Sequence, residues 1–293
     1  MIHDQADELR QLVRQRAVAG DPRGAAVPLV VVGGGKGDVG TTTMAMNLAI
    51  ALARRGRQAV FVDADLDHGG NAPLDHHPER GSVVDVLAGR RAVHEVLVRG
   101  PSGIQVVSGA WPAGELGDCS EAAQQRFVGE LKNLSPQAEV VVVDAGSSRN
   151  HFVRRLWHAA DVVLVVTTPD PASIMECYAA IKVLLNPTAA PAIHTLVNRA
   201  PTAAVARDVH SRIGEACRRF LGLPAVAAGH VGPCDPPAAG EPTMIFPARS
   251  AAARALDRVA DTMWAQLQRN RTRGIAPRGA TMDITLAGAQ RIE

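Results

Sequence analysis

Short apolar runs that end at turn residues constrain the fold of this 293-residue chain more than any other feature. Runs that are apolar at nearly every position are typical of strands buried on both faces of a parallel sheet. Helix-like segments lie between them, so strands and helices alternate as in β-α-β units. The sequence therefore predicts an α/β fold, a doubly wound, mostly parallel sheet flanked by helices, with ligands at the carboxyl ends of the strands. The predicted strands span 28–32, 58–62, 104–107, 138–143, 161–166, 192–197 and 225–230, and the clearest helices 42–55, 122–134, 174–185 and 205–220.

The chain divides into one large domain and two short appendages. Residues 1–25 combine apolar positions at helical spacing with a Gly-Asp-Pro-Arg-Gly break at 20–24, which predicts an amphipathic helix and a linker. Residues 26–268 hold all the predicted strands. With 46% hydrophobic residues the chain has enough apolar material for one large core. Residues 269–293 turn to Arg, Gly and Pro and are predicted to be a flexible tail.

Composition excludes several functional classes. The chain has 31 basic and 29 acidic residues and a formal net charge of +2, so nucleic acid is not an expected partner. The four cysteines lack metal spacing and the N-terminus is too polar for a secretory signal, which predicts a reducing, cytoplasmic location. Every apolar run is shorter than the roughly 18 residues that a membrane span needs. Any membrane contact is therefore expected to be peripheral.

A glycine-rich loop follows the first predicted strand. It reads Gly33-Gly34-Gly35-Lys36-Gly37-Asp38-Val39-Gly40-Thr41-Thr42-Thr43 and leads into a predicted helix. In such a loop the backbone N–H groups and the helix N-terminus bind phosphate, and a hydroxyl from Thr42 or Thr43 suits Mg²⁺. The pattern G-x-x-x-x-G-K-[ST], aligned on Gly35 and Gly40, requires lysine at position 41 and finds threonine. The alternative is a glycine-rich turn that no longer holds nucleotide.

The loop resembles the deviant Walker A motif xKGGxGK[TS] of the MinD/ParA superfamily, whose early lysine reaches the nucleotide of the partner subunit. Lys36, Gly37, Gly40 and Thr42 match it, whereas Asp38 replaces a glycine and Thr41 replaces the in-subunit lysine. The resemblance implies ATP and Mg²⁺ as ligands and a homodimer that closes on ATP, with Lys36 acting in catalysis. Both departures oppose binding of a polyanion, and hydrolysis is expected to be weak or absent because Thr41 replaces the P-loop lysine. The nucleotide-binding residues that it implies are Gly35, Lys36, Gly37, Asp38, Val39, Gly40, Thr41, Thr42, Thr43, Asn198 and Arg199.

Acidic residues end two of the predicted strands. Asp63 and Asp65 follow the run 58–62, and Asp144 follows the run 140–143 in the form of a Walker B motif, which supports Mg²⁺ through water. For Asp63 and Asp65, solvated strand-end acids are the alternative. By the family resemblance Asp65 orients the attacking water, and Thr42, Asp63 and Asp144 serve the metal. Asn198, at another strand end, matches the asparagine that reads the adenine edge.

Three further segments resemble the flagellar-number regulators of the FlhG type. Residues 166–174 and 178–182 are similar to TTPEPTAITDAYALIK, residues 220–231 resemble the segment near the last strand, and the likeness covers about 26–265. Residues 4–10 match the D-Q-A-x-x-L-R element, which in that family forms a helix that docks on the GTPase FlhF and stimulates its hydrolysis. Asp4, Gln5, Leu9 and Arg10 are the implied partner-binding residues, with Gln5 near the GTPase nucleotide. The alternative is a frayed amphipathic segment.

Three hypotheses for function remain at this point. The first is an ATP-binding regulator of flagellar number or placement that switches by dimerisation, contacts an FlhF-like GTPase and controls flagellar assembly proteins. The second is an active ATPase in spatial positioning, and the third is an interaction module that binds no nucleotide. Recruitment to the inner membrane or cell pole is expected only through partners, because glycines and prolines in 269–293 argue against a membrane-binding helix. His68, His76 and His77 are interpreted as solvated loop residues rather than metal ligands.

Overall fold

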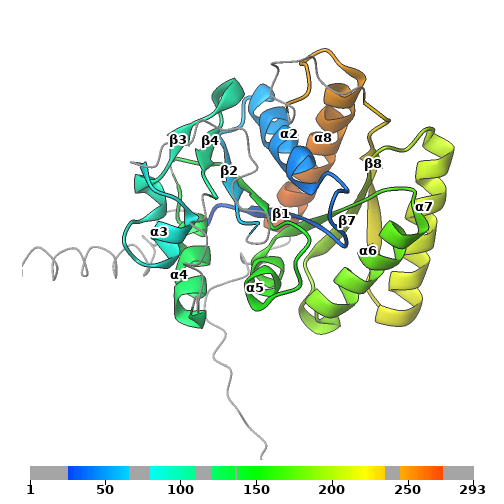
Figure 1. Cartoon of the computed structure of the whole chain (residues 1–293), viewed down its shortest axis with the longest axis horizontal. Coiled ribbons are helices and arrows are strands. Elements are labelled where there is room, and N and C mark those ends of the chain that lie inside the picture. Colours follow the sequence, from blue (N-terminus) through cyan, green and yellow to red (C-terminus); the bar gives the residue numbers. More distant parts are fainter. Residues whose placement is uncertain (1–25, 66–79, 110–119, 136, 235–244, 273–293) are drawn as a thin grey trace, which may run out of the picture.

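Eight strands form one sheet in the order β3-β4-β2-β5-β1-β6-β7-β8, in a computed structural model that describes residues 26–65, 80–109, 120–135, 137–234 and 245–272 (Figure 1). All neighbouring strands run parallel except β3 and β4, which are antiparallel. The predicted doubly wound, mostly parallel fold is confirmed. The strands are β1 (Leu29–Gly34), β2 (Ala59–Asp63), β3 (Val98–Arg99), β4 (Gln105–Val107), β5 (Val140–Asp144), β6 (Val162–Thr167), β7 (Ala192–Val197) and β8 (Ala225–His230).

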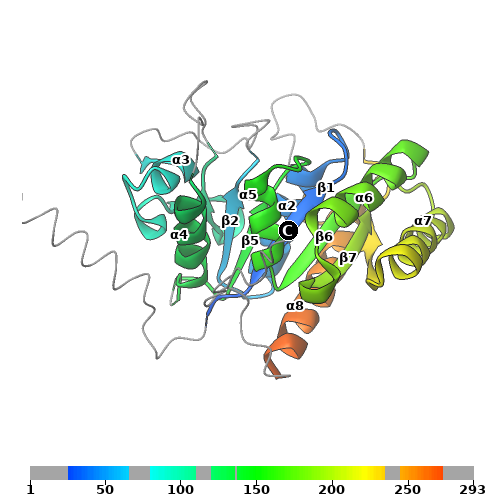
Figure 2. The ribbon, with the colours of Figure 1, turned by 90° about the horizontal axis from the view of Figure 1, so that it is seen from below.

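Helices cover both faces of the sheet. On one face α2 and α8 lie side by side, and on the other α3, α4, α5, α6 and α7 form a row (Figures 1 and 2). Arg54 of α2 and Arg55, which follows the helix, form ion pairs of 2.6 and 2.9 Å with Asp257 of α8, and these supplement the apolar contact between the two helices. The helices are α2 (Thr41–Arg54), α3 (Val83–Leu87), α4 (Glu121–Lys132), α5 (His151–Ala159), α6 (Pro171–Leu184), α7 (Ala203–Ala216) and α8 (Ala251–Thr272), with short turns η2 (Val93–Glu95), η3 (Pro101–Gly103), η4 (Pro187–Ala189) and the π-helical η5 (Cys217–Leu221).

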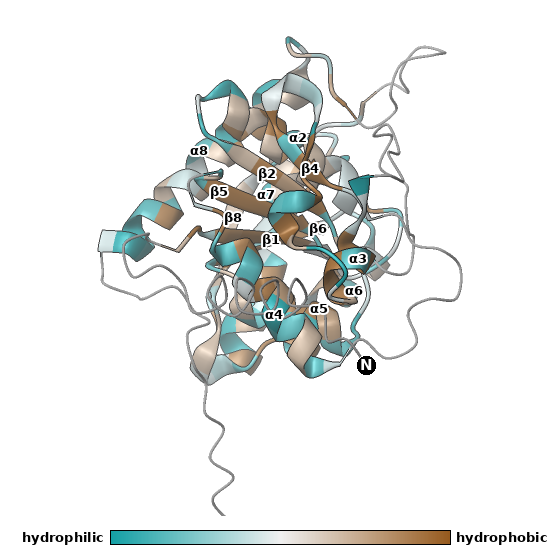
Figure 3. Ribbon diagram, turned by 90° about the vertical axis from the view of Figure 1, so that its left-hand side faces the viewer, coloured by the Kyte–Doolittle hydropathy of each residue, from teal (hydrophilic) through white to brown (hydrophobic). Residues whose placement is uncertain are grey.

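The central strands are apolar because side chains on both of their faces are buried. In β1, Leu29 and Val31 belong to the core beneath α4 to α6, whereas Val30 and Val32 belong to the core beneath α2 and α8. Figure 3 shows these strands as a continuous hydrophobic layer through the molecule. Successive residues of a strand point to opposite faces, so a strand between two helical layers is apolar throughout rather than alternating.

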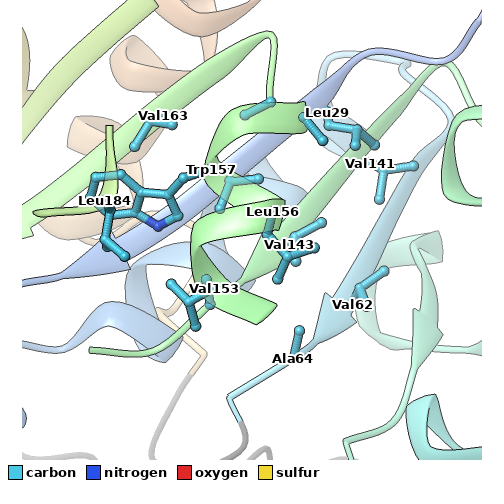
Figure 4. Close-up of a cluster of buried hydrophobic side chains, with 14 of the residues drawn as sticks. Leu29, Val62, Ala64, Val141, Val143, Val153, Leu156, Trp157, Val163 and Leu184 are labelled. Atoms are coloured by element: carbon cyan, nitrogen blue, oxygen red, sulfur yellow. The ribbon is translucent and has the colours of Figure 1, made fainter. Parts of the chain in front are cut away.

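Trp157 of α5 fixes how closely this helix approaches the sheet. Its indole is fully buried and lies among Val153, Leu156, Val163 and Leu184 (Figure 4). A Cβ atom added at Gly33 of β1 would lie 2.7 Å from the indole Cζ2, which is closer than real Cβ contacts. Gly33, the first glycine of the glycine-rich segment, therefore gives the tryptophan room, and this packing holds the end of β1 in place.

Several elements differ from those predicted. The two-residue β3 is too short to give a periodic pattern, and α3, α5 and α8 were not among the helices named from the sequence. The helix expected at 205–220 is divided into α7 and the π-helical turn η5. The last helix runs to Thr272 and so extends past the predicted start of the tail at residue 269. The segments 1–25 and 273–293 lie outside the described residues.

Candidate functional site: a phosphate loop beside buried carboxylates

The N-terminus of α2 is open toward the glycine-rich loop. Gly40 precedes the helix with φ 88° and ψ 29°, no side chain caps the helix, and its first turn holds no acidic residue. The helices α4, α5, α6 and α7, in contrast, are each capped by a side chain, from Ser120, Asn150, Asp170 and Thr202. The first N–H groups of a helix have no intrahelical acceptor, and they carry the positive end of the helix dipole. This end of α2 is therefore suited to an anion.

Two glycines are needed for the shape of the loop. A Cβ atom at Gly40 would lie 2.6 Å from the Nδ2 of Asn198, and the positive φ already disfavours any other residue. A Cβ atom at Gly35 would lie 2.2 Å from the carbonyl carbon of Glu176 in α6. The loop thus passes between the end of β7 and the second turn of α6, with no space for side chains at these two points.

The two departures from the family motif have different structural settings. Thr41 is 8% exposed, and its Oγ1 would be 2.7 Å from a Cβ atom added at Gly34, so this side chain is packed against the start of the loop. Asp38 has φ 62°, a left-handed conformation that glycine adopts more readily. The aspartate therefore adds backbone strain as well as a negative charge to the loop.

Lys36 lies beside an acidic residue of its own chain. Its Nζ is 3.7 Å from the Oδ2 of Asp170, and both side chains are about half exposed, at 52% and 50%. Asp170 also caps α6 through the N–H of Ser173 at 3.0 Å. An exposed pair at this distance contributes little to stability, so Lys36 is held only weakly.

Three carboxylates gather behind the loop, as the sequence predicts. Asp63 and Asp144 are neighbours in the register of β2 and β5, and Asp63 accepts a hydrogen bond of 3.3 Å from the N–H of Asp65. All three are buried, with exposures of 3% for Asp63, 7% for Asp65 and 0% for Asp144. A Cβ atom at Gly146 would lie 2.3 Å from the Cγ of Asp65, which places the chain after β5 against this carboxylate. The alternative of solvated strand-end acids is wrong for Asp63 and Asp65.

Burial changes the titration of two of these acids. It raises the pKa of Asp63 to about 6, with a smaller contribution from the charge of Asp65 and an opposing hydrogen bond from the Asp65 backbone. Burial raises the pKa of Asp144 to about 7. The negative charge of Asp63 adds to this shift, and a side-chain hydrogen bond with Thr42 opposes it. Buried carboxylates whose pKa values are raised are stabilised in their charged form by a nearby cation.

The residues present fit Mg²⁺ held together with phosphate. The Oδ1 of Asp144 accepts a hydrogen bond of 3.1 Å from the N–H of Gly146, whereas its buried Oδ2 has no hydrogen-bond partner among the described residues. Within the same residues no three His, Cys, Asp or Glu side chains converge to hold a metal alone. Mg²⁺ in nucleotide sites is commonly bound through one or two carboxylates, water and phosphate, so Asp144 and the hydroxyl of Thr42 would suffice on the protein side.

Asn198 contacts the phosphate loop directly. Its Nδ2 donates a hydrogen bond of 2.9 Å to the carbonyl of Val39, and its Oδ1 accepts one of 2.9 Å from the N–H of Arg199. Its side chain is 6% exposed, and Arg199 has φ 56°. The structure thus shows Asn198 holding the loop, and its role in reading the adenine base stays a prediction, as does that of Arg199.

Arg149 was not among the residues predicted from the sequence. Its Nη2 donates a hydrogen bond of 3.2 Å to the carbonyl of Gly35 and also pairs with the carboxylate of Glu176. The one sequence signal is a cation five residues after Asp144, where D-A-G-S-S-R departs from the family's D-T-G-A-G.

Several residues singled out in the sequence lie in segments outside the described residues: Asp4, Gln5, Leu9, Arg10, His68, His76 and His77. Among the described helices, none is both long and apolar enough for a membrane span.

Comparison with known proteins identifies relatives for most of the chain. Residues 28–186 match a family model described as an AAA domain. The chain is 31% identical to the antiactivator FleN of Pseudomonas aeruginosa over 206 residues, which cover 70% of this chain and 72% of FleN. It is 31% identical to the flagellum site-determining protein YlxH of Helicobacter pylori over 158 residues, which cover 53% of this chain and 52% of YlxH.

The fold is shared with solved structures of more distant proteins. The septum site-determining protein MinD of Pyrococcus horikoshii, solved with Mg-ADP, superposes with a TM-score of 0.64 at 17% identity and covers 87% of this chain and 100% of its own. The cell division ATPase MinD of Pyrococcus furiosus superposes with a TM-score of 0.63 at 20% identity and covers 81% of this chain and 98% of its own. At these identities the likeness establishes the fold.

Proposed function

The chain belongs to the MinD/ParA superfamily of P-loop ATPases, near the antiactivator FleN and the flagellum site-determining protein YlxH, and we propose that it regulates flagellar number or placement. In this proposal the protein binds ATP with Mg²⁺, dimerises in the bound state and contacts an FlhF-like GTPase. The relative YlxH is a flagellum site-determining protein, and this supports the flagellar role. Hydrolysis is slow or absent.

The observation that carries nucleotide binding is the open N-terminus of α2 beside the buried Asp144. The uncapped first turn supplies donors for phosphate, and the unpartnered Oδ2 of Asp144 supplies an acceptor for Mg²⁺. In a protein that no longer binds nucleotide, an unpartnered buried carboxylate oxygen costs stability and has no compensating use. The Mg-ADP bound in the Pyrococcus horikoshii relative is consistent with this assignment.

The residues divide the binding task among them. Backbone N–H groups of Gly35 to Thr43 and the dipole of α2 would bind phosphate, and Thr42 and Asp144 would hold Mg²⁺ directly or through water, with Asp63 beside them. Lys36 is exposed and weakly paired, so it is free to leave Asp170 for the phosphates of a second subunit. Asp65 would orient water, and Asn198 keeps the loop in shape.

The partner contact rests on the segment ahead of the domain. Asp4, Gln5, Leu9 and Arg10 fit the D-Q-A-x-x-L-R element at its fixed positions. A glutamine amide orients water or phosphate without a titration step, as glutamines do in other GTPases. We therefore assign the contact with an FlhF-like GTPase to this segment, with flagellar assembly proteins as the further partners.

A second candidate is an interaction module without nucleotide. It is favoured by the two departures in the loop, since Thr41 offers no charge and Asp38 brings a negative one. An active ATPase in spatial positioning is a third candidate, and it requires Lys36 to replace the missing charge. Since charge stabilisers in phosphoryl transfer are worth roughly 10³ to 10⁵ in rate, the threonine at position 41 weighs against rapid turnover.

Calorimetric titration of ATP and Mg²⁺ into the full chain tests the proposal. Binding by the natural protein, with turnover below detection, supports a nucleotide-controlled regulator. Binding only after Thr41→Lys or Asp38→Gly, and none by the natural protein, overturns it in favour of the interaction module. Light scattering with and without ATP then tests dimerisation, with Lys36→Ala as the variant expected to stay monomeric.

A second experiment tests the partner contact. An FlhF-like GTPase is assayed for GTP hydrolysis with the full chain and with Gln5→Ala. Stimulation by the natural chain that is lost in the variant supports the assignment, and equal rates with and without the chain contradict it.

A further inference from the structure

A positive charge beside the start of the phosphate loop comes from a residue that the family motif does not include. Arg149 follows β5, and its guanidinium donates to the carbonyl of Gly35 at 3.2 Å. The same guanidinium is paired with the carboxylate of Glu176 on α6. Its side chain is 35% exposed, so it is partly desolvated and yet open to a ligand.

The loop itself is short of positive charge. Position 41, where the ordinary motif has a lysine, is a buried threonine. Asp38 adds a negative charge, and the Nζ of Lys36 lies beside Asp170 at 3.7 Å. A triphosphate that entered the loop would therefore meet the dipoles of backbone N–H groups. It would find no cationic side chain at position 41 of the same chain.

We propose that Arg149 binds the nucleotide phosphates and supplies, from the same chain, the charge that Thr41 lacks. This inference rests on the proposed function, since it assumes that the loop takes a nucleotide. On binding, the guanidinium exchanges the carboxylate of Glu176 and the carbonyl of Gly35 for phosphate oxygens. Arginine is suited to this exchange because its planar fork holds a phosphate through two parallel N–H groups.

The backbone before Arg149 is fixed to the loop and to the strand beneath it. The N–H of Gly34 donates to the carbonyl of Gly146 at 2.8 Å, and the N–H of Ala145 donates to the carbonyl of Val32 at 2.9 Å. Asn150 then caps α5 by accepting from the N–H of Val153 at 2.9 Å. Arg149 thus lies between two anchored points, and only its side chain has to move.

Glu176 neutralises the charge of Arg149 when no nucleotide is bound. The N–H groups that converge in the loop present their positive ends to the guanidinium, which is unfavourable for a cation, and the half-exposed carboxylate of Glu176 offsets this repulsion. The rival interpretation is a purely structural one, in which Arg149 joins α6 to the loop through Glu176. The two interpretations differ in what happens when Glu176 is removed.

The test is calorimetric titration of ATP and Mg²⁺ into the full-length natural protein, Arg149→Gln and Arg154→Gln. Arg154 is the matched control, because it is an exposed arginine of the adjoining α5 that donates to the carbonyl of Val183 at 3.0 Å. Loss of a charge-assisted hydrogen bond to phosphate predicts a Kd about 10- to 100-fold higher for Arg149→Gln. Arg154→Gln is expected to keep the natural Kd.

Two further variants separate phosphate binding from a structural role. Glu176→Gln keeps or lowers the natural Kd if Arg149 contacts phosphate, and raises it as much as Arg149→Gln if the ion pair is only structural. Thr41→Lys restores binding in the Arg149→Gln background by a larger factor than it improves the natural protein, because both cations serve the same phosphates.

The outcomes are distinguishable from failure of the proposed function. A natural protein that binds no ATP overturns that function and this inference together. A natural protein that binds ATP, with an unchanged Kd in Arg149→Gln or with an equal loss in Glu176→Gln, overturns the inference alone.

Discussion

The side chain of Asn198 at the end of β7 donates a hydrogen bond of 2.9 Å to the carbonyl of Val39 in the phosphate loop, 159 residues earlier in the chain. Both residues are buried, with exposures of 6% and 3%. The loop therefore keeps its shape through a contact with the far half of the sheet. A residue that would be assigned to base recognition by family position also positions the loop.

Asn198→Asp tests this contact, because aspartate keeps the acceptor for Arg199 and removes the donor for Val39. The buried carbonyl of Val39 is left unpaired and faces a carboxylate, so we expect the free energy of unfolding to fall by about 1–3 kcal/mol. Urea unfolding without nucleotide measures it. Unchanged stability would show that the hydrogen bond does not hold the loop.

Gly40→Ala should disrupt the contact between Asn198 and the phosphate loop from the side of the loop. The new Cβ would lie 2.6 Å from the Nδ2 of Asn198 at a residue with φ 88°, so we expect a loss of about 1–3 kcal/mol in stability without nucleotide. Gly37→Ala is the matched control, since a Cβ there meets no atom within 4 Å and its φ is not positive. Equal unfolding midpoints for the two variants would contradict this interpretation.

The features that could be predicted from the sequence are those that depend on a single strand or a single loop. Strands buried on both faces are visible as apolar runs, and Asp63 and Asp144 stand out because each ends such a run. The contacts of Arg149 with Gly35 and of Asn198 with Val39 join residues more than 100 positions apart, and no local pattern encodes them. The helix α8 forms its ion pairs with α2 across about 200 residues, and β3 is too short for periodicity.

Asp38→Gly should improve stability and ATP binding together. Glycine adopts the φ of 62° without strain and removes a negative charge, so we expect a gain of up to about 1 kcal/mol in stability and a lower Kd for ATP. Ser102→Gly is the control, because Ser102 has φ 55° in the exposed turn η3. It is expected to gain stability by thermal unfolding while its Kd for ATP stays unchanged. A Kd that falls equally in both variants would exclude a local effect of the charge.

His194 predicts how stability depends on pH. Burial in β7 lowers the pKa of this histidine to about 4, the charge of Arg269 adds to the shift, and a hydrogen bond with Gln266 opposes it. In the unfolded chain a histidine titrates near pH 6.5, so between pH 6.5 and about 4 the unfolded state binds more protons than the native state. Stability from this residue is complete above about pH 6.5 and is lost as the pH falls toward 4, by roughly 3 kcal/mol at most. Urea unfolding of the natural protein and of each variant at pH 7.5 and pH 5 measures this, because the contributions of Asp63 and Asp144 cancel when a variant is compared with the natural protein at the same pH. Between pH 7.5 and pH 5 the stability of His194→Gln relative to the natural protein should rise by about 2 kcal/mol. That of His151→Gln, a substitution at an exposed position of α5, should stay constant. The assignment fails if His194→Gln keeps the full natural difference, because the proton uptake would then belong to other groups.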